Sequence, residues 1–335
     1  VVRRGSTDEL RVMHVGAPID PKNVIAIQLA FLSTKRDDAK AKGRFGIGLK
    51  TLNQLGERLE IHSSPFHFAV KGGVIERVAA VRSIRGLYAT GKPETLFRLP
   101  LTGEFNGEAL KRWASEELTP EHLLFLDSVR TLELIDLRSG RSEWSVELNE
   151  QRLPEIELDL GQGRRAKIER VRLGDAAASN TWTRYSTDYP VPLELKLKRA
   201  HKKTERTTPL AIAVPEKHPS GLLSAGLPLG VNCELPFALN AQFDPETSRH
   251  RLAHRRWNEW LFDRLADVAS AVAVHRFAEK PSTGWISVPL SEEAASDDPW
   301  IQCQLADLVA QIQQQALSRA RVVADGSPVR LADLV

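Results

Sequence analysis

Short alternating segments between residues 58 and 101 restrict this chain to a fold that contains an antiparallel β-meander. Segments 58–62 (Arg-Leu-Glu-Ile-His) and 66–70 (Phe-His-Phe-Ala-Val) alternate with the period of two that is typical of β-strands. The pair Gly72-Gly73 predicts a tight hairpin turn into a further strand over 74–81. Another strand is predicted over 95–101, so we expect this part of the chain to form one sheet.

The residues before the meander predict one strand and two helices. Segment 10–15 alternates like a short strand and stops at Gly16. Asp20 and Pro21 then supply a favourable N-cap and a favourable first helical residue. A glycine-rich turn over 43–48 opens a second helix, with leucines at 49, 52 and 55 facing inward and Gly56 as its C-cap. The order strand, helix, loop, helix and meander predicts an α/β sandwich with the sheet on one face.

From about residue 104 the pattern changes, and a second domain is expected. It predicts a helix over 108–117, strands over 131–135, 209–214 and 235–243, charged hairpin strands to about 172, and helices over 255–277 and 300–322. Trp257 and Trp260 begin the long helix and are interpreted as core anchors. The tail after Val322 is interpreted as a linker. The predicted domains are 1–104, 105–285 and a C-terminal linker and helix over 286–335.

The composition is that of a soluble globular protein, with 42% hydrophobic and 27% charged residues. No apolar run approaches the roughly 20 residues that span a bilayer, so neither a membrane span nor a membrane partner is expected. No signal peptide is recognised, and Cys233 and Cys303 have no metal-type spacing, so a reducing, cytoplasmic setting is expected. The net charge of +3 does not by itself indicate nucleic acid. The basic cluster 196–203 could contact phosphates or form a solvated strand end and loop.

The glycine-rich segment 43–50 (Gly-Arg-Phe-Gly-Ile-Gly-Leu-Lys) carries the most specific chemistry. Glycines at this spacing at the start of a helix let backbone N–H groups converge on one point, which suits a phosphate. Glycines also mark bends and close helix packing, so the loop alone leaves both interpretations open. It is not a Walker A loop, because no Gly-Lys-Ser/Thr follows, and the polar segment before it does not fit a Rossmann turn.

Together with segment 33–38 (Ser-Thr-Lys-Arg-Asp-Asp), this loop resembles the lid and glycine box of the GHKL ATPases, most of all the sacsin and Hsp90-like branch. The likeness runs from about residue 9 to about residue 275 and continues in order through segments 10–18, 94–101, 123–126, 226–244, 248–249 and 257–258. The resemblance implies a Bergerat-type α/β sandwich, then an α/β middle-domain-like region and C-terminal helices. It also implies ATP in a pocket between the sheet and the helices, under a mobile lid.

The resemblance assigns a set of residues to nucleotide binding. The glycine loop would face the phosphates. Lys35 would contact a phosphate, or it would be an exposed lysine beside acidic neighbours. Thr95 would close the adenine side, or it would be an ordinary β-branched strand residue. The complete set is His14, Gly16, Ser33, Thr34, Lys35, Gly43, Arg44, Phe45, Gly46, Gly48 and Thr95.

Two departures from the family pattern bear on catalysis. His14 stands where the family has the aspartate that accepts a hydrogen bond from the adenine amino group; a neutral imidazole nitrogen could accept that bond. The helix that carries the family's water-activating glutamate and Mg²⁺-binding asparagine does not fit between Val1 and Glu9. The Mg²⁺ ligand is therefore expected upstream of Val1, and no residue of this chain is assigned to a metal. The chain is expected either to lack the catalytic helix or to be the remainder of a longer protein.

Arg249 is the one catalytic candidate. It lies where Hsp90-like proteins have the middle-domain arginine that reaches the γ-phosphate when the domains close. A guanidinium there would stabilise charge on the transferring phosphoryl group. The alternative is a surface arginine that pairs with Asp244 or Glu246.

The resemblance implies an ATP-binding module that couples ATP hydrolysis to closure of its lid and domains, as in a chaperone or remodelling protein. The alternative is a degenerate module without hydrolysis that serves only protein contacts. The expected partners are ATP or ADP and a protein client or further domains of a larger polypeptide, with nucleic acid weakly supported. Hydrolase or transferase chemistry by a Ser/His/Asp set has little support, because His201, His218, His250 and His254 lie near no nucleophile motif.

Overall fold

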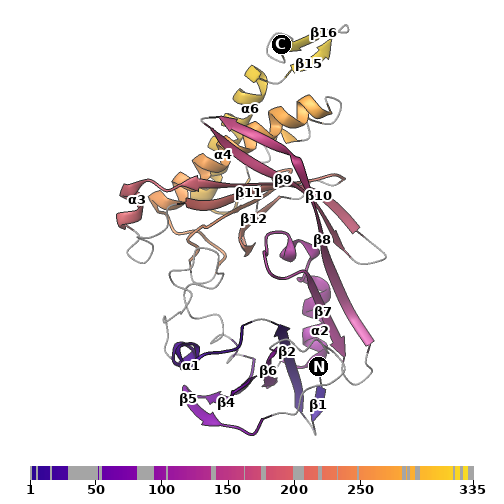
Figure 1. Ribbon diagram of the computed structural model, residues 1–335, viewed down its shortest axis with the longest axis vertical. Helices are drawn as coiled ribbons and strands as arrows, with labels where there is room; N and C mark the ends of the chain where they lie inside the picture. Colours follow the sequence, from indigo (N-terminus) through magenta and orange to yellow (C-terminus); the bar gives the residue numbers. More distant parts are fainter. Residues whose placement is uncertain are drawn as a thin grey trace. The chain divides into compact units, whose positions relative to one another are not determined.

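The computed structural model divides the chain into two compact units, which are described separately (Figure 1). Unit 1 comprises Val1–Thr119 and Glu133–Ser145, and unit 2 comprises Pro120–Leu132 and Val146–Val335. The predicted boundaries at 104/105 and 285/286 stay predictions. The structure describes residues 2–4, 7–15, 17–28, 52, 55–80, 94–102, 105–136, 141–161, 163–174, 179–198, 207–217, 221–231, 233–246, 249–280, 284, 287–290, 295–319, 321–324 and 327–330.

Unit 1 is built on a six-stranded antiparallel sheet with the strand order β1-β2-β6-β3-β4-β5. Its strands are β1 (Val2–Arg4), β2 (Thr7–Val15), β3 (Arg58–Ser63), β4 (Phe66–Lys71), β5 (Val74–Arg77) and β6 (Glu94–Pro100). The predicted strands over 10–15, 58–62, 66–70 and 95–101 are thereby confirmed. The last of them, β6, inserts between β2 and β3, so it occupies the middle of the sheet.

The two faces of this sheet differ in chemistry because residues alternate along each strand. One face buries Leu59, Ile61, Phe68, Val70 and Leu99 in a single apolar cluster. Side chains of helix α1 (Pro21–Gln28) and of Leu52 and Leu55 pack against that cluster. The opposite face carries mostly charged and imidazole side chains. An apolar face covered by a helix and a polar opposite face agree with the predicted α/β arrangement.

Turn and cap chemistry explain how unit 1 connects its elements. Asp20 accepts a hydrogen bond from the Asn23 N–H (2.7 Å) and donates its own N–H to the Asn23 side chain (3.1 Å), which caps α1 as predicted. Gly72 and Gly73 have φ of 55° and 81°, and they form the predicted hairpin turn. The strand that follows ends at Arg77, earlier than the predicted 81.

Gly56, predicted as a helix C-cap, does not have the positive φ that glycine caps commonly adopt, and the cap itself stays a prediction. Glycine is needed there for another reason. A Cβ on Gly56 would lie 2.1 Å from the carbonyl oxygen of Pro100, so the close approach of the two backbones excludes a side chain. The helix predicted around it lies largely outside the described residues.

Helix α2 (Gly107–Glu116) closes unit 1 and confirms the helix predicted over 108–117. The Asn106 side chain accepts from the Ala109 N–H (2.9 Å), and the Asp8 carboxylate accepts from the Gly107 N–H (2.7 Å). Both acceptors satisfy N–H groups of the first helical turn, and the Asp8 charge is favourable beside the positive end of the helix dipole. The short 3₁₀ helix η2 (Pro120–Leu123) follows and belongs to unit 2.

Unit 2 contains most of an eight-stranded sheet with the order β13-β12-β14-β11-β10-β9-β8-β7. All neighbours whose register is defined are antiparallel except β12 and β14. Most of strand β7 and the start of β8 are grouped with unit 1 by their contacts. The strands are β7 (Thr131–Asp136), β8 (Arg141–Gly161), β9 (Arg164–Gly174), β10 (Ser179–Pro190), β11 (Thr207–Pro215), β12 (Leu222–Ala225), β13 (Leu227–Pro228) and β14 (Ala238–Ala241).

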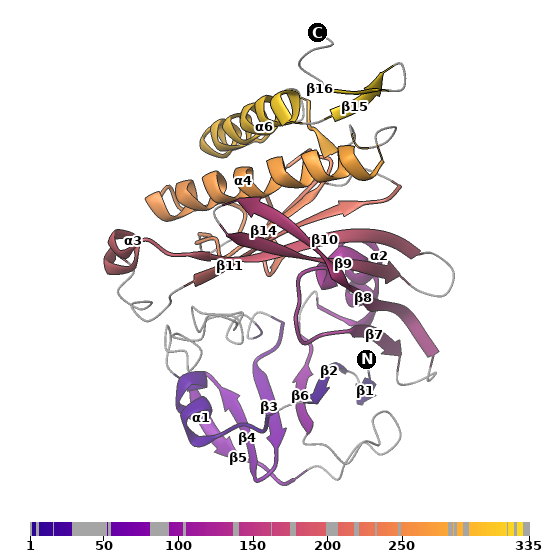
Figure 2. The ribbon, with the colours of Figure 1, turned by 45° about the horizontal axis from the view of Figure 1, so that its top comes forward.

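Two long helices supply the other layer of unit 2. Helix α4 (Arg256–Glu279) lies along the sheet, and α6 (Pro299–Arg319) packs on α4 (Figure 2). Trp257 is 4% exposed and donates its indole N–H to the Gln242 carbonyl (2.8 Å), while Trp260 packs at the edge of the same core. Both predicted helices and the role of the two tryptophans as core anchors are therefore confirmed. Among the helices in the described ranges, none is long and apolar enough to cross a membrane.

Three features of unit 2 depart from expectation. Strand β10 was not predicted, although it lies near the centre of the sheet. The tail is not a plain linker, because β15 (Arg321–Ala324) and β16 (Ser327–Arg330) pair as an antiparallel hairpin. The start of the basic cluster 196–203 is not a strand end, because residues 196–198 belong to the short helix α3 (Leu193–Lys198). The coarse prediction of a mixed α/β chain with C-terminal helices is confirmed.

Candidate functional site

His14 and Thr95 are directly opposite each other on the adjacent central strands β2 and β6 of unit 1. Opposed residues in an antiparallel pair point to the same face of the sheet, here the face that carries the apolar cluster. The Thr95 side chain is buried, and its Oγ1 lies 2.9 Å from the Ser63 Oγ on β3. The Ser63 hydroxyl also accepts a hydrogen bond from the Ile19 N–H (2.9 Å), just before α1. One end of the apolar face therefore gathers polar groups from three strands.

This polar end of the face could recognise a flat ligand with a polar edge. A hydroxyl donates one hydrogen bond and accepts others, so Thr95 and Ser63 can serve a ligand while they bind each other. The His14 ring is exposed and stacks on the Phe97 ring with 5.9 Å between centroids. A neutral imidazole offers one donor and one acceptor nitrogen. The arrangement provides a hydrogen-bonding edge beside apolar side chains, which is the usual composition of a small-molecule site.

The sequence reasoning did not identify Ser63. A signal existed, because Ser63 occupies an inward position of the alternation that also places Leu59 and Ile61 in the core. A polar residue at an inward position is a departure from the strand pattern that calls for a hydrogen-bonding partner. That partner, Thr95, is 32 residues away in sequence.

Most of the other predicted nucleotide-binding residues lie outside the described residues, so their placement stays a prediction. They are Gly16, Ser33, Thr34, Lys35, Gly43, Arg44, Phe45, Gly46 and Gly48.

Arg249 lies in unit 2, in a loop between β14 and α4. Its φ of 61° is in the left-handed region, which is uncommon for a residue with a side chain. Its Nη2 donates to the carbonyl oxygen of Leu227 (3.2 Å), and burial lowers the pKa of its guanidinium. The alternative pairing with Asp244 or Glu246 stays a prediction. Asp244 lies 3.9 Å from Arg255, and the Glu246 carbonyl oxygen accepts a hydrogen bond from the Arg249 N–H (3.0 Å).

The loop that carries Arg249 is held at both ends by Asn258, which is fully buried on α4. The Asn258 Oδ1 accepts from the Asp244 N–H (2.9 Å), while its Nδ2 donates to the carbonyls of Asp244 (3.0 Å) and Ala253 (2.7 Å). A β-bridge between Pro245 and Leu252 closes the base of the loop. Because both ends of the loop are fixed, the surrounding structure can offset the energetic cost of the left-handed backbone conformation of Arg249.

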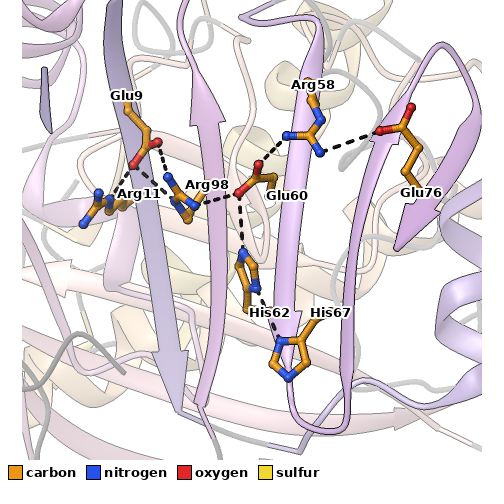
Figure 3. A network of polar contacts seen from close by, with 8 residues as sticks. All are labelled: Glu9, Arg11, Arg58, Glu60, His62, His67, Glu76 and Arg98. Carbon is orange, nitrogen blue, oxygen red and sulfur yellow. Dashed lines mark hydrogen bonds and ion pairs between the residues drawn. The ribbon is translucent and has the colours of Figure 1, made fainter. Parts of the chain in front are cut away.

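A second polar cluster occupies the opposite face of the unit 1 sheet (Figure 3). At its centre, Arg98 on β6 bridges two carboxylates, with 2.8 Å from Nη2 to the Glu9 Oε2 and 2.7 Å from Nη1 to the Glu60 Oε2. Arg11 also pairs with Glu9 (2.5 Å). Burial works to raise the pKa of Glu9, but its hydrogen bonds and charge interactions with Arg98 and Arg11 outweigh it and hold this pKa below its usual value.

The cluster continues along β3 and β4 to two histidines. The His62 Nε2 lies 3.5 Å from the Glu60 Oε2, and its Nδ1 lies 3.3 Å from the His67 Nδ1. Burial lowers the pKa of His62, against the opposing effect of Glu60. On the other side of Glu60, Arg58 pairs with both Glu60 and Glu76.

Comparison with known proteins adds no assignment. A scan of the sequence against models of protein families finds no match, and a search of curated proteins finds none either.

Proposed function

We propose that this chain is a nucleotide-binding module of the GHKL type, similar to the Hsp90 and sacsin branch, with ATP as its ligand. The sequence support is the glycine loop of residues 43–50 and the ordered set of segments around it. The structural support is an antiparallel sheet with one apolar face covered by a helix, as a Bergerat-type sandwich requires. In this proposal unit 1 holds the nucleotide, and unit 2 corresponds to the middle-domain-like region.

The observation that carries the proposal is the cross-strand pair of His14 and Thr95. The resemblance assigns both residues to the adenine side, although 80 residues separate them in sequence, and strand register makes them direct neighbours on one face. The buried Thr95 hydroxyl and its Ser63 partner fit the polar edge of a purine. The phosphate end would be formed by Gly16, Ser33, Thr34, Lys35, Gly43, Arg44, Phe45, Gly46 and Gly48.

In this proposal the chain's own residues bind and orient ATP, which supplies the transferable phosphoryl group. The Mg²⁺ ligand is expected from residues upstream of Val1. Arg249 would contribute positive charge for the phosphoryl group when nucleotide is bound. Its support is the left-handed backbone of Arg249, in a loop whose ends Asn258 holds, and a guanidinium whose described hydrogen bond goes to a neutral carbonyl. ATP hydrolysis coupled to closure of the lid and domains would act on a protein client or on a further domain of a larger cytoplasmic polypeptide.

A second function is favoured by His14 itself. The family aspartate is a full charge that accepts a hydrogen bond, whereas an exposed imidazole can present either a donor or an acceptor. Weaker adenine recognition would leave a module without hydrolysis, used only for protein contacts.

Calorimetric titration of Mg·ATP and Mg·ADP into the natural full-length polypeptide tests the proposal. We expect saturable binding by the wild type that Gly46→Val abolishes. Thr95→Val keeps the side-chain shape and removes the hydroxyl, so it should weaken binding about tenfold or more, since a buried hydrogen bond of about 1.5 kcal/mol is lost. The matched control is Thr207→Val on β11, an exposed strand threonine that should leave binding unchanged.

Measurement of ATP hydrolysis then distinguishes the two proposed functions. Binding with hydrolysis that Arg249→Ala slows at least tenfold would support the ATPase. Binding without hydrolysis would favour the interaction module. A folded full-length protein that binds neither nucleotide would overturn the proposed ligand.

A further inference from the structure

We propose that the nucleotide site of unit 1 accepts guanine nucleotides as well as adenine nucleotides. This inference rests on the proposed function and names the range of bases that the site would take. Its basis is a polar row of three residues across the central strands of the sheet: His14 on β2, Thr95 on β6 and Ser63 on β3. Strand register places His14 opposite Thr95, and the Thr95 and Ser63 hydroxyl oxygens lie 2.9 Å apart.

The polar row borders an apolar part of the same sheet face. Two residues along each strand, this face carries Val12, Phe97 and Ile61, and both Val12 and Ile61 are register partners of Phe97. Val12 is 46% exposed, so apolar surface beside the row is accessible to a ligand. A purine could lie over this surface while its edge meets the row. Apolar contact does not distinguish adenine from guanine, so in this account hydrogen bonds to the row distinguish them.

Adenine and guanine present opposite hydrogen-bonding patterns on the edge that carries position 6. Adenine has an amino group there, which donates, and N1 beside it accepts. Guanine has a carbonyl oxygen, which accepts, and its N1–H donates. A protein group with a fixed role therefore favours one base. A carboxylate only accepts, so it suits the amino group of adenine and repels the carbonyl oxygen of guanine.

His14 has no such fixed role. A neutral imidazole has one donor and one acceptor nitrogen, and a change of tautomer exchanges them. The contact described for the His14 ring is its stack on Phe97, which favours neither tautomer. The side chain is exposed, so water can satisfy the nitrogen that does not face the base. The ring can therefore accept from adenine or donate to guanine from the same position.

The hydroxyl pair behind His14 can reverse in the same way. The Ser63 Oγ accepts from the Ile19 N–H at 2.9 Å, and this bond is compatible with either direction of the bond between Ser63 and Thr95. If Ser63 donates, the Thr95 hydroxyl is left to donate; if Thr95 donates, its oxygen is left to accept. Thr95 is 2% exposed, so its hydroxyl would reach the base through a shared water, which suits both directions.

Calorimetric titration of the natural full-length polypeptide with Mg·ATP and with Mg·GTP tests the inference. We expect the two wild-type dissociation constants to lie within about tenfold of each other. His14→Asp introduces a group that only accepts, so it should raise the preference for ATP at least a further tenfold or so, as expected when one polar group loses its partner. His14→Asn should reverse that gain, because its amide again offers a donor and an acceptor. The matched control is His254→Asp in unit 2, where the side chain is 60% exposed, and it should keep the wild-type ratio.

A spectroscopic readout on the wild type keeps the test decisive if His14→Asp does not fold. In nitrogen-15 spectra of the His14 ring, the nitrogen that faces the base should be unprotonated with Mg·ATP and protonated with Mg·GTP. The same tautomer in both complexes would overturn the inference, because His14 would then not adapt to the base.

The outcomes also separate this inference from the proposed function. Saturable ATP binding with a preference over GTP of more than about tenfold in the wild type would overturn the inference and leave the proposed function standing. A ratio that His14→Asp does not change would also overturn the inference alone. Binding of neither nucleotide by the folded full-length protein would overturn the proposed function, and the inference with it.

Discussion

Replacing Arg98 with methionine should destabilise unit 1 strongly, because Arg98 is the cation that neutralises two carboxylates on the sheet. It makes three charged hydrogen bonds, two to Glu9 at 2.8 and 3.3 Å and one to Glu60 at 2.7 Å. The side chains of Arg98, Glu9 and Glu60 are 11%, 5% and 15% exposed, so solvent screens these charges little. Methionine has a similar length but leaves both carboxylates without this partner.

Breaking a buried ion pair from one side costs about 3–5 kcal/mol, and the remaining partners Arg11 and Arg58 favour the lower end. We therefore expect a loss of about 3 kcal/mol. Because the chain has two units, one global unfolding curve is not a clean measure, and native-state hydrogen exchange of β3 and β6 peptides is preferable. A loss of about 3 kcal/mol should speed their slowest exchange roughly a hundredfold.

The pH dependence of this loss tests its electrostatic origin. In the wild type the pKa of Glu9 is depressed below 4.5, so its contribution to stability is present above that pH and is lost as the pH falls through the depressed pKa. In the variant, burial without Arg98 raises this pKa, so the deficit should be full at pH 7 and shrink toward pH 4.5 as the carboxyl groups protonate. The control Arg77→Met, on the exposed edge strand β5, should change stability by less than about 0.5 kcal/mol. A deficit under 1 kcal/mol, or one independent of pH, would refute the reasoning.

Three further predictions concern packing and reactivity. Gly56→Ala should destabilise unit 1 by about 3 kcal/mol or more, because its Cβ would lie 2.1 Å from the Pro100 carbonyl oxygen; hydrogen exchange of β3 and β6 peptides measures this, and unchanged exchange would contradict the close approach. Asn258→Ala should cost unit 2 about 3 kcal/mol, since three buried hydrogen bonds are lost, and should speed proteolysis of residues 244–253; unchanged cleavage there would contradict the clamp. Iodoacetamide at pH 8 should modify the exposed Cys303 and spare Cys233, whose pKa burial raises to about 11, as peptide mass spectrometry would show; equal labelling would contradict this burial.

Elements with strong periodicity could be predicted from the sequence alone. The hairpin of β3 and β4 alternates cleanly and leads into a glycine turn, and α4 repeats apolar residues at helical spacing over many turns. Helix α1 was predictable from its cap, because Asp20 before Pro21 is a local signal. These signals need no knowledge of the rest of the fold.

Strand β10 was missed although its inward residues Tyr185 and Tyr189 are buried in the core of unit 2, because polar residues are interspersed among them. On the opposite face of β10, Arg184 is 9% exposed, and Glu150 and Glu169 neutralise it from β8 and β9. Such pairing depends on strand register, which one sequence does not reveal. The tail hairpin had a local signal, since Asp-Gly is a sequence pattern typical of two-residue hairpin turns, but the composition of the segment favoured a linker interpretation.

In the candidate site, too, some residues could be predicted from the sequence and others depend on strand register. The resemblance named His14 and Thr95 by position, and strand register explains why two such distant residues could serve one ligand. The alternation of β3 marks Ser63 as an inward polar residue, but the partners of Ser63 and of His62 depend on which strands become neighbours, and no local pattern indicates that.

Photoaffinity labelling of the natural full-length polypeptide with Mg·2-azido-ATP tests the central claim most directly. The account predicts saturable labelling that excess ATP prevents, with the adduct in peptides from residues 7–28, 58–71 or 94–102, around His14, Ser63 and Thr95. Labelling that does not saturate, or a competed adduct confined to unit 2, would contradict it.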